Sequence, residues 1–112
     1  MTKSIVQDDT SKCFLCGKNG ASDPLEVHHI FGGPNRRLAD EDGLIVHICG
    51  FRCHREGRSA AHKSFATAEY LRTVGQEAYE RTHTREEFFR RYGRNYIGGQ
   101  YEQSYFDGSP CT

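Results

Sequence analysis

The chain has 112 residues, 36% of them hydrophobic and 27% charged, and its 15 basic and 15 acidic residues give a formal net charge of zero. This length suits one small domain, residues 1–112, with a thin core. The absence of a long apolar run argues against a signal peptide or a membrane span, so we expect a cytoplasmic protein with no membrane partner. A neutral chain also has no general attraction to nucleic acid, so any DNA-binding surface must be local.

The first half of the chain predicts a cysteine knuckle followed by a β-hairpin. Residues 1–11 are polar and lack periodicity, so we expect a loose arm. Next comes a Cys-x2-Cys knuckle at residues 13–16, where Gly17 permits a left-handed turn. Apolar and β-branched runs at residues 25–31 and 44–48 predict two strands, joined by a polar loop over residues 32–43.

The second half predicts helices. Residues 50–56 would start a short helix after the second strand, and Gly57 would break it. Apolar residues recur at helical spacing over residues 65–82, and a capping box at Thr84 opens a shorter helix that Gly93 ends. The fold class is therefore α+β, with a ββα core at about 13–63, C-terminal helices at about 65–93 and a loose tail at 98–112.

The cysteine spacing predicts a structural metal site. A domain of this size needs a staple, and a reducing compartment disfavours disulfide bonds. Two closely spaced pairs offer four thiolates, which is the ligand set of a closed tetrahedral zinc site: Cys13, Cys16, Cys49 and Cys53. Buried free cysteines are the alternative interpretation. The fifth cysteine, Cys111, lies in the tail and is expected to be unpaired.

Four of the chain's six histidines are candidate site residues. His28 and His29 are adjacent in the first strand, so they should point to opposite faces, one towards a metal and the other towards a substrate. His54 and His62 follow the second cysteine pair. The whole pattern over residues 13–63 resembles the HNH endonucleases, the ββα-metal nucleases, and in particular small phage and prophage proteins with Cys-x2-Cys ahead of His-His-Ile.

The resemblance implies a zinc-stapled, treble-clef-like ββα-metal domain. It places His29 on the general base, and His28, His54 and His62 on the ligands of one divalent ion. It also implies a metal-dependent endonuclease or nickase that hydrolyses DNA phosphodiester bonds to 5′-phosphate and 3′-hydroxyl products. The catalytic ion would be Mn²⁺, Mg²⁺, Ni²⁺ or Zn²⁺, and imidazole ligands suit Mg²⁺ least. The protein would act in a bacterial host or be encoded by a phage.

Three features depart from the family pattern. The central asparagine of HNH has no clear counterpart, and Asp40, Asp42 or a backbone carbonyl near Gly43 are left as candidates for orienting His29. The second cysteine pair has one residue more than the common spacing. The two later histidines are eight residues apart, so they converge only if Gly57 breaks the helix between them.

Arginines near the histidines are candidate phosphate contacts. They are Arg36, Arg37, Arg52 and Arg55. The basic and aromatic stretch at residues 90–96 could extend this surface, or could be a solvated helix face. The histidines too could be packed or surface side chains without a ligand role. The competing function is a non-catalytic zinc-binding module that binds nucleic acid or acts as a phage adaptor. Sequence preference, nicking against double-strand cleavage, and monomer against homodimer stay open.

Overall fold

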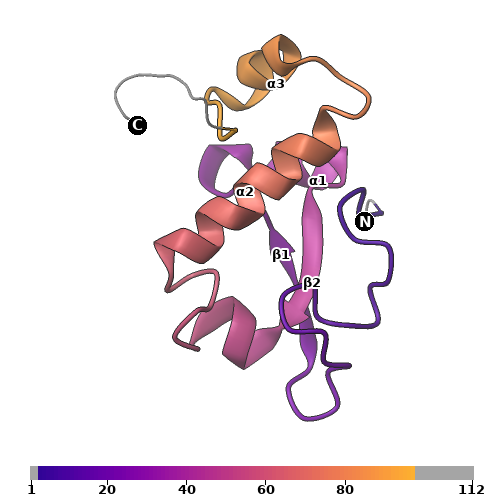
Figure 1. Cartoon of the computed structure of the whole chain (residues 1–112), viewed down its shortest axis with the longest axis vertical. Helices are drawn as coiled ribbons and strands as arrows, with labels where there is room; N and C mark the ends of the chain where they lie inside the picture. Colours follow the sequence, from indigo (N-terminus) through magenta and orange to yellow (C-terminus); the bar gives the residue numbers. More distant parts are fainter. Residues whose placement is uncertain (1–2, 98–112) are drawn as a thin grey trace.

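Two short apolar runs pair as an antiparallel hairpin at the centre of the molecule (Figure 1). The structure is a computed structural model that describes residues 3–97. The first strand, β1, spans Leu25–His29 and the second, β2, spans Ile45–Cys49. Leu25 pairs with Cys49 and His29 with Ile45, so the cysteine end and the histidine end of the hairpin lie at opposite ends of the ladder. The α+β prediction and the hairpin are confirmed.

The connection between the strands is helical, so the predicted polar loop is wrong. A short 3-10 turn, η1 (Gly33–Asn35), leads into α1 (Arg36–Asp42). Pro34 lies in the first turn of η1, and Gly43 closes α1 with a φ of 73°, which only glycine adopts without strain. The helix has seven residues and buries only Ala39, which is too little for a periodic apolar pattern to appear in the sequence.

A wide π-helical turn, η2 (Gly50–Arg55), follows β2 directly. Gly57 then packs so closely that an added Cβ would lie 2.0 Å from the backbone oxygen of Arg52. The chain turns back beyond it, and the N–H of His62 donates to the carbonyl of His54 at 3.0 Å. The prediction that the helix ends near Gly57 and returns His62 to His54 is therefore confirmed.

Two further helices cover the hairpin (Figure 1). α2 (Phe65–Tyr79) begins at Ser64, whose side chain accepts the N–H of Thr67, and it ends three residues before the predicted end. α3 (Arg85–Tyr92) has the predicted capping box, in which Thr84 and Glu87 satisfy each other's backbone N–H groups. Gly93 ends α3 in the left-handed conformation, as predicted.

The core lies between the hairpin and the two long helices. Its largest fully buried side chains include Leu44 and Ile48 from the hairpin, Leu71 from α2 and Phe88 from α3. Gly75 lies in the middle of α2, where a Cβ would be 3.2 Å from the side chain of Ile30. A glycine that weakens an isolated helix thus allows this helix to approach the hairpin closely.

The N-terminal segment is fixed along β2, so the predicted loose arm is wrong for the described residues. Ser4 is buried, and its hydroxyl donates to the carbonyl of Ile45 at 2.6 Å. The side-chain oxygen of buried Gln7 accepts the N–H of His47 at 2.7 Å. On this edge of β2, polar side chains supply the hydrogen bonds that a neighbouring strand would otherwise make. Because these residues are polar, the sequence gives no sign that they are buried.

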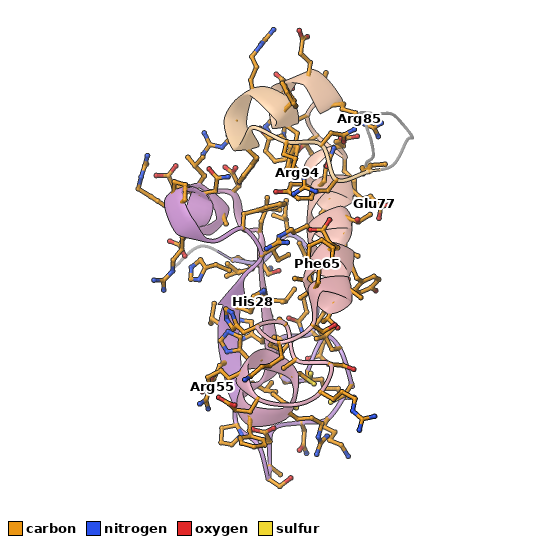
Figure 2. The ribbon with its side chains drawn as sticks, turned by 90° about the vertical axis from the view of Figure 1, so that its left-hand side faces the viewer. His28, Arg55, Phe65, Glu77, Arg85 and Arg94 are labelled. Atoms are coloured by element: carbon orange, nitrogen blue, oxygen red, sulfur yellow. The ribbon has the colours of Figure 1, made fainter. Side chains whose placement is uncertain are left out.

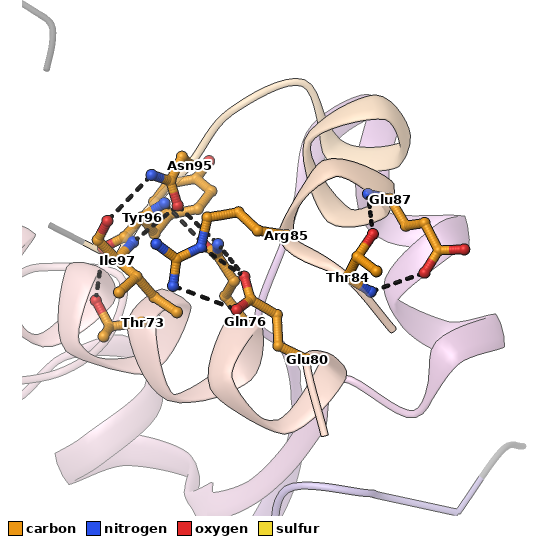
Figure 3. A network of polar contacts seen from close by, with 9 residues as sticks. All are labelled: Thr73, Gln76, Glu80, Thr84, Arg85, Glu87, Asn95, Tyr96 and Ile97. Atoms are coloured by element: carbon orange, nitrogen blue, oxygen red, sulfur yellow. Dashed lines mark hydrogen bonds and ion pairs between the residues drawn. The ribbon is translucent and has the colours of Figure 1, made fainter. Parts of the chain in front are cut away.

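A buried glutamine attaches the end of the described chain to α2 (Figure 3). Gln76 is fully buried, donates to the side-chain oxygen of Asn95 at 2.7 Å and accepts the N–H of Tyr96 at 2.7 Å. Thr73 donates to the carbonyl of Tyr96 at 3.1 Å. The predicted loose tail at 98–112, with Cys111, lies outside the described residues. Over residues 3–97, no helix has the length and apolar character that a membrane crossing requires.

Candidate functional site

Four cysteines meet where the N-terminal knuckle reaches the far end of the hairpin. Their sulfur atoms all lie within 4.8 Å of one another: Cys13, Cys16, Cys49 and Cys53. The sulfurs of Cys16 and Cys49 are 3.5 Å apart, well beyond a disulfide bond. Zinc–sulfur bonds of about 2.3 Å in a tetrahedron put neighbouring sulfurs about 3.8 Å apart, so this cluster fits a zinc ion.

The protonation of these thiols also suits a metal site. Burial raises the pKa of Cys13, but N–H groups of Cys16, Cys49 and Leu15 outweigh it and lower the pKa to about 7. Burial and the neighbouring sulfurs raise the pKa of Cys49 to about 11 and also raise that of Cys53. Four thiolates this close, three of them buried and only Cys16 exposed, would repel one another strongly, so a dication is the charge that such a cluster lacks.

Three histidines form a second cluster beside the hairpin, one of which, His28, is labelled in Figure 2. His28 comes from β1, His54 from η2 and His62 from the loop that returns after Gly57. One nitrogen from each lies within 4.8 Å of the others, and the Nε2 atoms of His54 and His62 are 3.1 Å apart. Nitrogen ligands of tetrahedral zinc are about 3.3 Å apart, so the three rings need little movement to share an ion.

The buried member of this cluster is held neutral. His28 is only 7% exposed, and burial, followed by the charges of His54 and His62, lowers its pKa to about 3. Burial also lowers the pKa of His62, with His54 as the smaller cause. A neutral imidazole keeps a lone pair, which is the form that binds metal.

Glu26 fixes the orientation of His54. Its carboxylate lies 2.8 Å from Nδ1 of His54, and a carboxylate can only accept, so that nitrogen carries the proton. The lone pair on Nε2 therefore points at the other two histidines. Arg55 donates to the same carboxylate through Nε at 3.1 Å and Nη2 at 3.2 Å. Metal-binding histidines are commonly oriented by such a carboxylate.

His29 points away from the cluster, towards α1. Its Nε2 lies 3.3 Å from the Oδ1 of Asp40, and Nε of Arg36 donates to its Nδ1 at 3.4 Å. Of the candidates for orienting His29, the structure therefore places Asp40 in contact with it. Asp42 turns the other way and accepts hydrogen bonds from Arg91 and Tyr92 on α3, at 2.6 Å each.

A cleft of about 350 Å³ is shared by His29 and by members of the histidine cluster. His28, His29 and His62 all line it, because His29 is the last residue of β1 and lies where the strand opens into the turn. Arg72 of α2, Asn35 and Tyr96 also line it. The basic side chain of Arg72 thus shares the cleft with His28, His29 and His62.

The predicted phosphate contacts divide into two groups. Arg36 and Arg37 line a second groove with His29 and Asp40, directly beside the first cleft. Arg55 turns to Glu26, and Arg52 is exposed on η2, where its N–H donates to Asp23 at 2.8 Å. Of these four arginines, only Arg36 and Arg37 line a groove that His29 also lines.

The sequence prediction missed Glu26 and Arg72. Glu26 had a usable signal, since it precedes His28 by two residues and must share its strand face. Arg72 had none, because its position beside His28 depends on how α2 packs across the hairpin. Comparisons with models of protein families, with curated proteins and with solved structures found no match to this chain.

Proposed function

We propose that the protein is a metal-dependent endonuclease or nickase that hydrolyses DNA phosphodiester bonds, as its resemblance to HNH nucleases implies. The proposal rests chiefly on one observation. His28 and His62, two members of the cluster that His54 completes, line the same cleft as the separately oriented His29. That arrangement offers a metal ligand set and a proton acceptor side by side, which hydrolysis of a phosphodiester needs.

His29 is the proposed general base. Because Asp40 only accepts, the proton of the neutral ring resides on Nε2, and Nδ1 carries the lone pair. Nδ1 would take a proton from the attacking water as its oxygen bonds to phosphorus. The bond to the 3′-oxygen then breaks, and that oxygen takes a proton from solvent. Asp40 is a positioning residue, since it holds the ring and stabilises the imidazolium that forms.

The three clustered histidines would hold one divalent ion, with Glu26 orienting His54 behind them. When bound, the ion would supply positive charge to stabilise the phosphate and the leaving oxygen. Neutral imidazoles favour Mn²⁺, Ni²⁺ or Zn²⁺ over Mg²⁺. Three protein ligands leave coordination positions for substrate, unlike the cysteine cluster, whose four thiolates would fill a tetrahedral zinc and make it structural.

Arg36 connects the base to the substrate in this proposal. It donates to Nδ1 of His29, the atom that must accept a proton. A DNA phosphate is a stronger acceptor for a guanidinium than a neutral imidazole is. Binding of DNA would therefore draw Arg36 away and free Nδ1 for water. Arg37, which pairs with Glu41 at 2.6 Å, would contact an adjacent phosphate of the DNA backbone.

Nicking of supercoiled plasmid tests the proposal. Wild-type protein is incubated with Mn²⁺, Mg²⁺, Ni²⁺ or Zn²⁺ and compared with His29→Ala, with exposed His83→Ala as the control. We expect nicking by wild type and His83→Ala, and a loss of about 10²- to 10⁴-fold in His29→Ala, the usual contribution of a general base. An absence of nicking by wild type in every metal refutes the proposal, and retained DNA binding would then favour the non-catalytic module.

A further inference from the structure

One wall of the histidine cleft is basic and comes from outside the ββα core. Arg72 on α2 lines the cleft together with Tyr96, which follows α3. The guanidinium of Arg94 lies 4.9 Å from the centre of the Tyr96 ring, and that of Arg72 lies 6.0 Å from it. Figure 2 shows Arg94 on the same side of the molecule as His28, beside α2.

This wall carries an unbalanced positive charge. Glu69 pairs with Arg72 at 2.7 Å and reaches Arg94 at 3.9 Å, so one carboxylate faces two guanidinium groups. Glu69 and Arg72 are both partly shielded from solvent, with side-chain exposures of 26% and 30%. Charges in a shielded cleft act more strongly on a ligand than charges on an open surface.

The wall is also held in place. Gln76 and Thr73 of α2 bind the backbone of Tyr96, and Asn95 binds Gln76, so the segment with Arg94 is fixed to the helix with Arg72 (Figure 3). The guanidinium of Arg72, which pairs with Glu69 at 2.7 Å, therefore loses less conformational freedom on binding an anion than a free surface arginine would. The polar network therefore prepares an anion-binding wall.

We infer that Arg72 and Arg94 bind a backbone phosphate of DNA next to the one that is cleaved, while Arg36 and Arg37 contact the strand on the other side of His29. This inference rests on the proposed function, because it takes the histidine cleft as the place of cleavage. The strand would run from the α2 wall, past His29, into the groove beside α1. α2 and the segment after α3 thereby become part of the substrate site.

A purely structural role for Arg72 gives a different expectation. If it only packs on Tyr96 and pairs with Glu69, its loss lowers stability and leaves the salt dependence of DNA binding unchanged. A phosphate contact releases counterions, so its loss reduces the slope of log affinity against log salt by about 0.9. The removal of Glu69, which competes for Arg72, would then strengthen binding.

Binding of a short fluorescent DNA duplex by anisotropy separates these roles. The experiment uses the full chain in a His29→Ala background with saturating Mn²⁺, so that the DNA stays intact. We expect Arg72→Ala to weaken binding roughly tenfold and reduce the salt slope by about 0.9. We expect Glu69→Gln to strengthen binding. Arg90→Ala is the control, since Arg90 is exposed on α3 and pairs with Glu86 at 2.9 Å.

The outcomes are distinct. If Arg72→Ala folds and binds like Arg90→Ala, the inference is overturned, whether or not wild type nicks plasmid. If Arg72→Ala does not fold, Glu69→Gln decides, and unchanged or weaker binding overturns the inference. Wild type could also fail to nick plasmid while Arg72→Ala weakens DNA binding and reduces the salt slope. In that case the proposed hydrolysis is refuted and the phosphate-binding wall is supported.

Discussion

At the scale of single residues, the histidine cluster depends on which nitrogen of each ring points inward. For His54 that choice is made by Glu26, whose carboxylate accepts a hydrogen bond from Nδ1–H at 2.8 Å. Gly50 makes the approach possible, because a Cβ there would lie 2.7 Å from the carboxyl carbon of Glu26. One carboxylate and one glycine thus determine the direction of a lone pair.

Replacement of this carboxylate should weaken the histidine metal site alone. We expect Glu26→Gln to lower metal affinity about 10- to 100-fold, because a neutral amide orients His54 less firmly and makes Nε2 a poorer ligand. Titration with Mn²⁺ or Zn²⁺ of protein whose cysteine site is already loaded measures this. Glu56→Gln is a matched control, since Glu56 is exposed and its carboxylate forms a long ion pair with Lys63, at 3.9 Å. Equal affinities in the two variants would contradict the role given to Glu26.

Asp40 should affect turnover without affecting metal affinity. Asp40→Asn keeps the shape but removes the charge that stabilises the His29 imidazolium. We expect the nicking rate to fall by less than the 10²- to 10⁴-fold contributed by the base itself, with the metal affinity of the histidine cluster unchanged. Single-turnover nicking rates and a metal titration give both quantities. A normal rate in Asp40→Asn would show that something else orients His29.

At the scale of elements, η2 and the loop after it join the cysteine cluster to the histidine cluster. η2 carries Cys53 and His54, and the N–H groups of Ala61 and His62 bond back to the carbonyls of those two residues, at 2.7 Å and 3.0 Å. Gly57 lies in the turn between them. The hydrogen bonds of this loop therefore bring His62 next to His54, although the two residues do not share one helix.

Gly57→Ala tests the loop. The added Cβ would lie 2.0 Å from the backbone oxygen of Arg52, so the turn must open. We expect a loss of about 1–3 kcal/mol in unfolding free energy, typical of overpacking, and a weaker histidine metal site. Thermal unfolding and metal titration measure both. Gly32→Ala is the control, because a Cβ there meets no atom within 4 Å. Similar behaviour of the two variants would refute the tight packing at Gly57.

Much of the element list follows from local sequence. Apolar and β-branched runs specify the hairpin, the Thr84 capping box and Gly93 specify α3, and the cysteine spacing specifies the cysteine cluster. The errors have a common cause. α1 buries one side chain, and the N-terminal segment buries polar residues such as Ser4 and Gln7. Neither segment therefore shows the regular spacing of apolar residues from which an element is predicted. Arg72 reaches the cleft through tertiary packing, which no local pattern encodes.

At the scale of the whole molecule, the cysteine cluster and the histidine cluster have different expected roles. The cysteine cluster connects the N-terminal segment, the end of β2 and η2, so zinc there would contribute directly to folding. The histidine cluster lies at a cleft whose walls come from β1, α2 and the segment after α3. Loss of its ion should leave the fold in place, because buried apolar side chains such as Ile48, Leu71 and Phe88 hold the hairpin, α2 and α3 together.

The most direct test of this account is the number of metal ions per chain, measured by native mass spectrometry on wild type and His62→Ala alongside plasmid nicking. His62 is exposed, so its removal should spare the core. We expect two ions in folded wild type, and one ion with no nicking in folded His62→Ala. A single ion in both proteins, or nicking that survives in His62→Ala with one ion bound, would contradict a catalytic metal held by the three histidines.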